Sequence, residues 1–209
     1  MPKRAGMIAV IDDSAFATKP NLVGKHVVLR PFRAEDAGAM VRILADPEVQ
    51  RLTGMVPSKT DASGEKPLLD SAHQWYSSRA EQDDRLDLAV GDRGTGEVVG
   101  EVVLNEWDPN NGSCNFRTLF GPHGRDRGLG TEAAQLVLAY AFDVVGLHRV
   151  GLEVYSFNPR ARRVYEKLGF VCEGTRREVL RFDDRWVDSD IMSVLATEWA
   201  QHRDNPTMG

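Results

Sequence analysis

Residues 120–133 read Phe-Gly-Pro-His-Gly-Arg-Asp-Arg-Gly-Leu-Gly-Thr-Glu-Ala, and the interpretation of the whole chain begins with them. They separate a short apolar run, typical of a strand, from residues 129–145, whose apolar side chains recur at helical spacing. The first turn of a helix leaves backbone N–H groups without partners, and the helix dipole makes that end electropositive. Gly128 and Gly130 carry no Cβ atom that would keep an anion away from these groups. The stretch therefore predicts a site for a diphosphate.

Other interpretations of the same glycines are open to test. A P-loop is excluded because no Gly-Lys-Ser/Thr follows the glycines. A dinucleotide fingerprint fits Gly128 to Ala133, with Glu153 about twenty residues further on. However, the glycines lie well past the end of the strand, and Glu153 falls within a later strand instead of at its end. A glycine-rich turn with ordinary surface arginines, Arg125 and Arg127, is a further alternative.

The rest of the chain alternates strand and helix patterns, which predicts an α/β fold whose sheet is part parallel and part antiparallel. Residues 55–66 are polar and broken by proline and glycine, so we expect a mobile loop there. We expect strands over residues 27–30, 86–90, 98–104, 115–120, 149–155, 177–182 and 189–195, and helices over 35–45, 68–82, 129–145 and 159–168.

Composition places the chain among ordinary globular proteins. It has 209 residues, of which 42% are hydrophobic and 27% charged, and a formal net charge of −5. We expect residues 1–20 to form a flexible arm and residues 21–209 to form a single domain. The acidic balance disfavours nucleic acid as a partner. No apolar run is long enough for a membrane span, and the two cysteines fit no metal-ligand spacing, so we expect a cytoplasmic protein without a metal.

A second motif follows the predicted strand 149–155. Asn158 and Pro159 form a strong helix start, because a capping side chain precedes a proline at the first helical position. Gly169 supplies a left-handed helix exit. Tyr165 lies two turns after the cap on the same helix face, so its hydroxyl could point toward whatever binds at that end. The alternative is a half-buried core tyrosine.

The order of these motifs resembles the GNAT acyltransferase superfamily. A strand is followed by the Arg-x-x-Gly-x-Gly loop, a helix, a second strand, Asn158, a helix with Tyr165, and Gly169-Phe170. The chain looks most like the RimJ/RimL branch, and the resemblance covers about residues 22–200. It implies a mixed central sheet of about seven strands flanked by helices, with two parallel strands that splay apart. It also implies transfer of an acyl group, most simply acetyl, from coenzyme A to a primary amine of a protein N-terminus or a small molecule.

The resemblance also implies which residues hold acyl-CoA as the co-substrate. The loop amides would bind the pyrophosphate, Asn158 the pantetheine arm, and a backbone N–H near Leu119 the thioester oxygen. Ala161 departs from the family, since serine often occupies that position. The full set of expected cofactor-binding residues is Leu119, Phe120, Arg125, Arg127, Gly128, Leu129, Gly130, Thr131, Asn158 and Arg162.

Acyl transfer to an amine needs a neutral amine and a route for two protons. Tyr165 would reprotonate the coenzyme A thiolate, and Glu101 or Glu106 would accept the amine's proton, with Asp108 a further candidate. Each acid alternatively lies on a solvated surface. The strand 116–120 lacks the glutamate that some family members use as the base. Neither cysteine has a paired histidine in view, so we expect direct attack of the amine on the thioester.

The acceptor is the least readable part of the sequence. Candidate walls of its site are aromatic residues that alternatively belong to ordinary packing: His73, Trp75, Tyr76 and Trp186. Arginines gather over residues 176–185, where they could attract an acidic acceptor or a succinyl group, or simply form a solvated face. The rival functions are a non-catalytic acyl-CoA-binding module, a succinyl-CoA-using variant and a nicotinamide-dependent oxidoreductase. A homodimer is left open.

Overall fold

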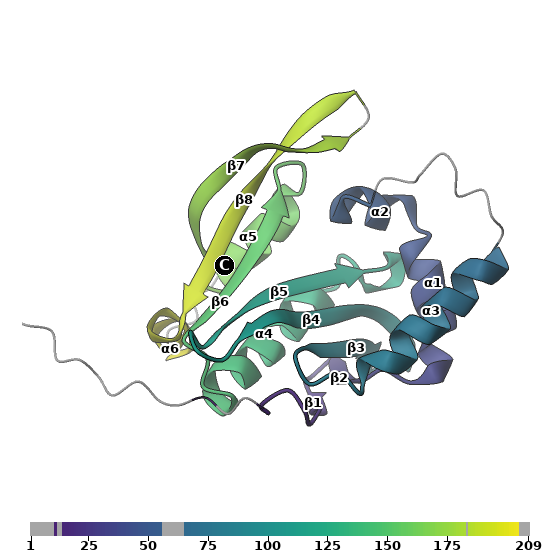
Figure 1. Cartoon of the computed structure of the whole chain (residues 1–209), viewed down its shortest axis with the longest axis horizontal. Helices are drawn as coiled ribbons and strands as arrows, with labels where there is room; N and C mark the ends of the chain where they lie inside the picture. The colour runs from purple at the N-terminus through teal and green to yellow at the C-terminus, as the bar shows by residue number, and fades with distance from the viewer. Residues whose placement is uncertain (1–10, 12–13, 56–64, 183, 205–209) are drawn as a thin grey trace, which may run out of the picture.

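The computed structural model describes residues 11, 14–55, 65–182 and 184–204, whose strands form one mixed sheet (Figure 1). The strands are β1 (Leu22–Val23), β2 (Val27–Pro31), β3 (Leu86–Asp92), β4 (Val98–Asp108), β5 (Ser113–Phe120), β6 (Arg149–Tyr155), β7 (Val171–Phe182) and β8 (Arg185–Leu195). Their order in the sheet is β1-β2-β3-β4-β5-β6-β8-β7. Only β5 and β6 pair in parallel among these strands. The expected mixed sheet is confirmed, and the two-residue β1 brings it to eight strands instead of about seven.

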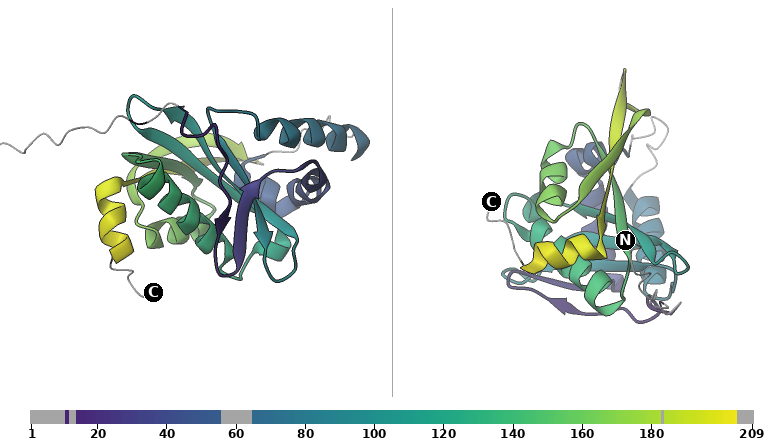
Figure 2. Two further views of the ribbon diagram at one scale, coloured as in Figure 1. Left: turned by 90° about the horizontal axis from the view of Figure 1, so that it is seen from below. Right: turned by 90° about the vertical axis from the view of Figure 1, so that its left-hand side faces the viewer.

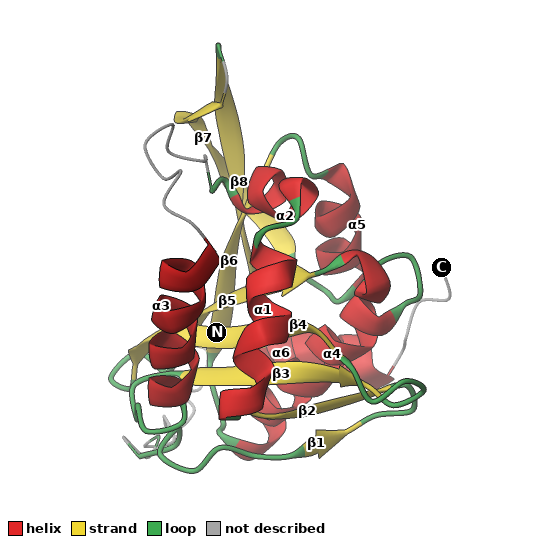
Figure 3. Cartoon of the chain, turned by 90° about the vertical axis from the view of Figure 1, so that its right-hand side faces the viewer, coloured by secondary structure: helices red, strands yellow, loops and turns green. Residues whose placement is uncertain are grey.

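Helices cover both faces of the sheet. They are η1 (Ala34–Asp36), α1 (Ala37–Leu44), α2 (Pro47–Thr53), α3 (Glu65–Arg79), η2 (Pro122–Gly124), α4 (Leu129–Ala139), the π-helical turn η3 (Tyr140–Val144), α5 (Pro159–Lys167) and α6 (Ala196–Asp204). Figure 3 shows α1 and α3 in front of β3 and β4, with α4 and α6 behind the sheet. Figure 2 shows α6 beside the helical segment that contains α4, where the rings of Phe142 and Trp199 stack at 5.8 Å.

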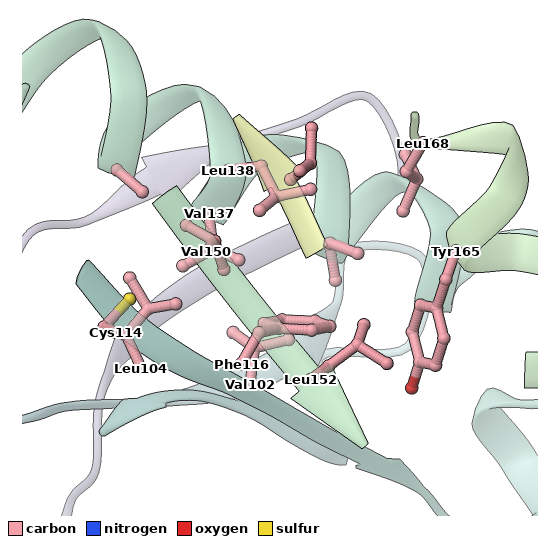
Figure 4. Packing of buried hydrophobic residues seen from close by; sticks show 14 of the residues in the cluster. Val102, Leu104, Cys114, Phe116, Val137, Leu138, Val150, Leu152, Tyr165 and Leu168 are labelled. Atoms are coloured by element: carbon pink, nitrogen blue, oxygen red, sulfur yellow. The ribbon is translucent and has the colours of Figure 1, made fainter. Parts of the chain in front are cut away.

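Alternation along the central strands separates two apolar clusters. On one face, Val102 and Leu104 of β4 pack with Val137 and Leu138 of α4 in the larger core (Figure 4). On the other face, Leu119 of β5 belongs to a smaller cluster beneath α1 and α3. Glu101 and Arg117 lie on the same face as this smaller cluster, because side chains two positions apart on a strand, and those directly opposite on its neighbour, point to the same face.

The parallel strands β5 and β6 separate after a short paired segment. Their register joins Ser113 to Arg149, Cys114 to Val150 and Asn115 to Gly151, and no later pairs follow. In Figure 1 the two strands visibly diverge beyond this point. The expected splay of the two strands is therefore confirmed, and it opens the sheet between α4 and α5.

Three details differ from the sequence expectations. The helix expected over residues 129–145 changes to a π-helical turn at Tyr140, and Val144, one of the apolar residues at the helical spacing, is 70% exposed. The wider π turn rotates the following side chains away from the helical stripe. Asp46, expected to end a helix, also begins α2, because its carboxylate accepts a hydrogen bond from Val49 N–H at 2.9 Å. Neither α2 nor α6 was predicted.

The amino-terminal segment is partly packed on the domain. Phe16 is fully buried, and its ring lies 5.0 Å from that of Trp107. Lys19 donates hydrogen bonds to the backbone oxygens of Phe16, Gln82 and Arg85. The expected flexible arm therefore does not extend through residues 14–20, and most of its remaining length lies outside the described residues. The mobile loop expected over residues 55–66 lies largely outside them too, apart from its ends.

Candidate active site

The amino end of α4 is open toward a cavity. Gly128 adopts φ +76°, a left-handed conformation that favours glycine, and as the N-cap residue it has no side chain that could cap the helix. A Cβ atom built on Gly128 would meet no other atom within 4 Å, so the residue faces open space. The N–H groups of the first turn are therefore free to bind an anion, with the helix dipole adding to the attraction.

This cavity, of about 180 Å³, lies between the amino ends of α4 and α5, beside the end of β5. Val49, Leu52 and Thr53 of α2 close it from the opposite side. It is here called the loop cavity. Of the expected cofactor-binding residues, those that line it are Leu119, Phe120, Arg125, Gly128, Gly130, Thr131 and Asn158. The α2 residues were missed because no helix was predicted there.

The two arginines of the loop are already engaged by carboxylates. Arg125 forms ion pairs with Asp46 at 2.6 Å and Glu48 at 3.1 Å, and its Nε donates to Phe120 O at 2.9 Å. Arg127 pairs with the buried Asp92 at 2.6 Å and lies outside the loop cavity. Arg125 therefore ties the loop to the start of α2, and Arg127 ties it to the end of β3.

Two other expected cofactor residues lie elsewhere. Leu129 is 2% exposed and packs in the larger core. Arg162 pairs with Glu166 and Asp190 and does not line the cavity. Arg160 does line it, on the same helix, and pairs with the exposed Asp126 at 2.9 Å. Sequence reasoning passed over Arg160, although its place two residues after a helix cap is the available signal.

Asn158 caps α5 as its sequence context predicts. Its Oδ1 accepts a hydrogen bond from Ala161 N–H at 3.1 Å. Among the described residues, none accepts a hydrogen bond from its Nδ2. The capped helix thus holds the carboxamide in place while leaving its N–H₂ group available to a ligand.

A second, larger cleft of about 710 Å³ joins the loop cavity from the other side of β5. We call it the polar cleft, because charged and amide side chains of β4, β5, β6 and β7 line it. The two spaces share six lining residues: Leu52, Thr53, Thr118, Leu119, Asn158 and Tyr165. Two different ligands could therefore meet beside Leu119 and Tyr165, where β5 and β6 have separated.

Tyr165 points from α5 into this junction. Its ring packs edge-on against Phe116, with centroids 6.1 Å apart, and Figure 4 shows the hydroxyl directed away from the helix, past Leu152. The hydroxyl makes no hydrogen bond to another described residue. Burial raises the pKa of Tyr165 to about 12, so the phenol keeps its proton at neutral pH and can donate it.

Glu101 lies on the other side of Leu119, opposite it in the β4–β5 register. Burial, then the charge of Asp87, raises the pKa of Glu101 to about 7, while a hydrogen bond from the Tyr76 hydroxyl opposes the rise. Arg85 holds Asp87 through two hydrogen bonds of 2.6 and 2.8 Å. A carboxylate with such a pKa can exchange a proton near neutral pH.

The other candidate bases are less well placed. Glu106 lines the polar cleft but is exposed, at a strand irregularity where its φ is +54°. Asp108 accepts hydrogen bonds from Asn111 in the turn before β5, which lower the pKa of the Asp108 carboxyl. Burial raises the pKa of the Cys114 thiol to about 12, so that sulfur is a poor nucleophile.

The expected aromatic walls do not come together. Tyr76 is buried against Phe32 with ring centroids 4.5 Å apart, and it reaches the polar cleft only through Glu101. Trp75 is 53% exposed beneath the Arg79 guanidinium, and His73 lies exposed on the same helix. Trp186 is 61% exposed near the tip of the β7–β8 hairpin, which projects from the body of the domain (Figure 1).

The fold and site define a class of protein: an α/β domain in which two connected spaces, one at an open helix end and one polar, meet where two parallel strands separate. In the described part of the chain, no group of His, Cys, Asp and Glu side chains is placed to hold a metal ion. No helix there is both long and apolar enough to cross a membrane.

Comparison with known proteins identifies the family. Residues 26–171 match the acetyltransferase (GNAT) domain, so the chain belongs to the GNAT acetyltransferase family and is an acyl-transferring enzyme. "Uncharacterized N-acetyltransferase p20" of Bacillus licheniformis is 27% identical, over 86% of this chain and 98% of that protein.

Two solved structures share the fold. A GCN5-related N-acetyltransferase from Brucella melitensis superposes with a TM-score of 0.71 at 27% identity, over 88% of this chain and 82% of that one. The spermidine N-acetyltransferase of Vibrio cholerae, solved with CoA and spermine, gives a TM-score of 0.73 at 21% identity, over 85% of this chain and 99% of that one.

Proposed function

We propose that this enzyme transfers the acetyl group of acetyl-CoA directly to a primary amine at the junction of the loop cavity and the polar cleft. One observation carries the proposal: the two spaces meet beside Leu119, between Tyr165 on one side and Glu101 on the other. In this arrangement the cofactor enters from the amino end of α4 and the amine from the polar cleft.

The proposed binding of the cofactor uses backbone groups more than side-chain charge. The open N–H groups around Gly128 and Gly130 bind the diphosphate, and Arg160, whose ion pair with Asp126 is exposed to solvent and so more easily exchanged, adds positive charge at the same cavity. The Asn158 carboxamide binds the pantetheine arm. Arg125 and Arg127 then act as positioning residues, since their carboxylate partners already neutralise them.

The proposed chemistry divides the proton transfers between the two sides of Leu119. Glu101 accepts a proton from the substrate ammonium, and the neutral amine attacks the thioester carbon. A backbone N–H next to Leu119, on the edge of β5 that faces away from β4, donates to the carbonyl oxygen as negative charge develops there. As the C–S bond breaks, Tyr165 donates its proton to the leaving thiolate, and the resulting phenolate takes the second proton from the nitrogen of the new amide. The proposed route needs no cysteine intermediate.

We also infer that the chain lies in the RimJ/RimL-like branch, on the order and spacing of its motifs. Resemblance to this branch is compatible with two classes of acceptor, a protein N-terminus and a small amine. The relative from Vibrio cholerae is named for spermidine, which supports a small amine.

A panel of amines tests the proposal. Purified enzyme is mixed with acetyl-CoA or succinyl-CoA and each amine, and free thiol release is followed. Amine-dependent release with acetyl-CoA is expected, and mass spectrometry should find the acetyl group on nitrogen. If neither donor releases thiol with any amine, the proposed function is wrong. Faster release with succinyl-CoA would instead favour the succinyl-using variant.

A further inference from the structure

Some charges of the polar cleft have no ion-pair partner among the described residues. Six charged side chains line it: Glu101, Glu106, Arg117, Arg149, Glu153 and Arg176. Arg149 is neutralised by Glu173, with one hydrogen bond of 2.7 Å, and Arg176 by Glu153 at 3.0 Å. Arg117 is exposed and has no ion pair within 4 Å in the described part of the chain. Its positive charge is therefore available to a ligand.

Strand register places Arg117 on the same sheet face as Glu101. Glu101 lies opposite Leu119, and Arg117 lies opposite Val103, one side-chain row further along. Such diagonal neighbours on an antiparallel pair have Cα atoms about 7–8 Å apart. The two opposite charges influence each other, yet their side chains are not in ion-pair contact. A gap with a carboxylate on one side and a guanidinium on the other therefore faces the cleft.

A molecule with an ammonium and a carboxylate a few bonds apart matches this gap. Its ammonium can approach Glu101, and its carboxylate can take a two-pronged hydrogen bond from Arg117. A wholly cationic amine would instead bring its other charges toward Arg117, at a Coulombic cost. Glu106 offsets the positive charge of Arg117 less closely than Glu101 does. It lies beyond the Asn105–Asn115 row, further along β4 from the Leu119 junction.

Resting on the acetyl transfer proposed above, we propose that the acceptor is a small amino acid-type molecule with a carboxylate near its primary amine, bound through that carboxylate by Arg117. The step is balanced as follows: the amine nitrogen forms the new N–C bond and the C–S bond breaks. The ammonium gives one proton to Glu101 before the attack; the thiolate receives the Tyr165 proton, and the second proton of the nitrogen restores the Tyr165 phenol. Arg117 binds and orients the acceptor without exchanging a proton.

Matched pairs of acceptors test the proposal. Each amino acid is compared with its own carboxamide, which keeps the amine and side chain but lacks the negative charge. The measured quantity is the ratio of kcat/KM for the acid to that for the amide, with acetyl-CoA as the donor. Because the amine of each compound titrates identically with every enzyme, comparing this ratio between variants removes differences in amine pKa.

Removing the cation in Arg117→Gln should lower that ratio at least about tenfold, mainly through KM of the acid, since a charge-assisted hydrogen bond is lost. Arg117→Lys should retain part of the preference because it keeps the charge without the fork. Arg181→Gln removes an exposed arginine from β7 outside the polar cleft and should leave the ratio unchanged. An unchanged ratio in both Arg117 variants overturns the proposal.

The arms of the experiment separate its two possible failures. If the wild-type enzyme acetylates amides or polyamines but no amino acid, this proposal is overturned while the proposed acetyl transfer stands. If no amine of any kind is acetylated, the acetyl transfer itself fails. If Arg117→Gln instead loses the use of succinyl-CoA with an amide acceptor, the carboxylate belongs to the donor, and the assignment to the acceptor is overturned.

Discussion

The proton-accepting role of Glu101 predicts a particular pH dependence. Burial and the charge of Asp87 raise its pKa from 4.5 to about 7. The base must be ionised to act, so activity should rise with pH through about 7 and then level off. With that pKa, roughly a tenth of the enzyme is active at pH 6 and roughly nine tenths at pH 8, about a ninefold difference. A glutamate with an unshifted pKa would be ionised at both pH 6 and pH 8, and activity would hardly differ between them.

The assay is kcat at saturating amine and acetyl-CoA between pH 5 and 9, measured for wild type and Glu101→Gln. The amine titrates in both enzymes, so the ratio of the two profiles isolates Glu101. Two further variants should move the midpoint in opposite directions. Asp87→Asn removes a negative neighbour and should lower it, whereas Tyr76→Phe removes a hydrogen-bond donor and should raise it.

Asp87 is buried and paired with Arg85, so replacing it can destabilise the fold. Circular dichroism melting therefore checks that each variant is folded. The reasoning is refuted if the ratio of the profiles is flat across pH 7. It is also refuted if the two neighbour variants move the midpoint in the same direction.

Two other substitutions have clear expectations. Tyr165→Phe should lower kcat on the order of 100-fold while leaving acetyl-CoA affinity by calorimetry unchanged, because only the proton donor is lost; full turnover would remove the role given to Tyr165. Phe16→Ala should cost about 3–5 kcal/mol of unfolding free energy, since the ring is fully buried, and lower Tm by roughly 6–20 °C. A Tm within a degree of wild type would show that residues 14–20 do not stabilise the domain.

Local patterns predicted the parts of the fold that depend on neighbouring residues. Asn158 and Pro159 mark the start of α5, and Gly128 marks the loop before α4, because caps and left-handed glycines are decided within a few residues. The separation of β5 from β6 was expected only because the motifs resemble those of a known family. The π-helical turn at Tyr140 was not predictable, since the apolar spacing around it is that of an ordinary helix.

The site could be predicted only where its chemistry is local. The arginines of the loop looked free in sequence, but the partner of Arg125 is Asp46, 79 residues away, and that of Arg127 is Asp92, 35 residues away. Likewise, the pKa of Glu101 depends on how α3 and β3 pack around it, which no spacing in the sequence reveals. Long-range pairs of this kind decide which of several similar charges remains available to a ligand.

The central claim is that the open amino end of α4 holds the diphosphate of acetyl-CoA. It is tested most directly by titrating acetyl-CoA calorimetrically into wild type, Gly128→Ala and Gly96→Ala. Both glycines have φ +76° and open space around an added Cβ atom, so the backbone strain is matched, but only Gly128 faces the loop cavity. We predict that Gly128→Ala weakens binding at least about tenfold while Gly96→Ala binds like wild type. Equal affinities in all three proteins, or no binding to wild type, would contradict the claim.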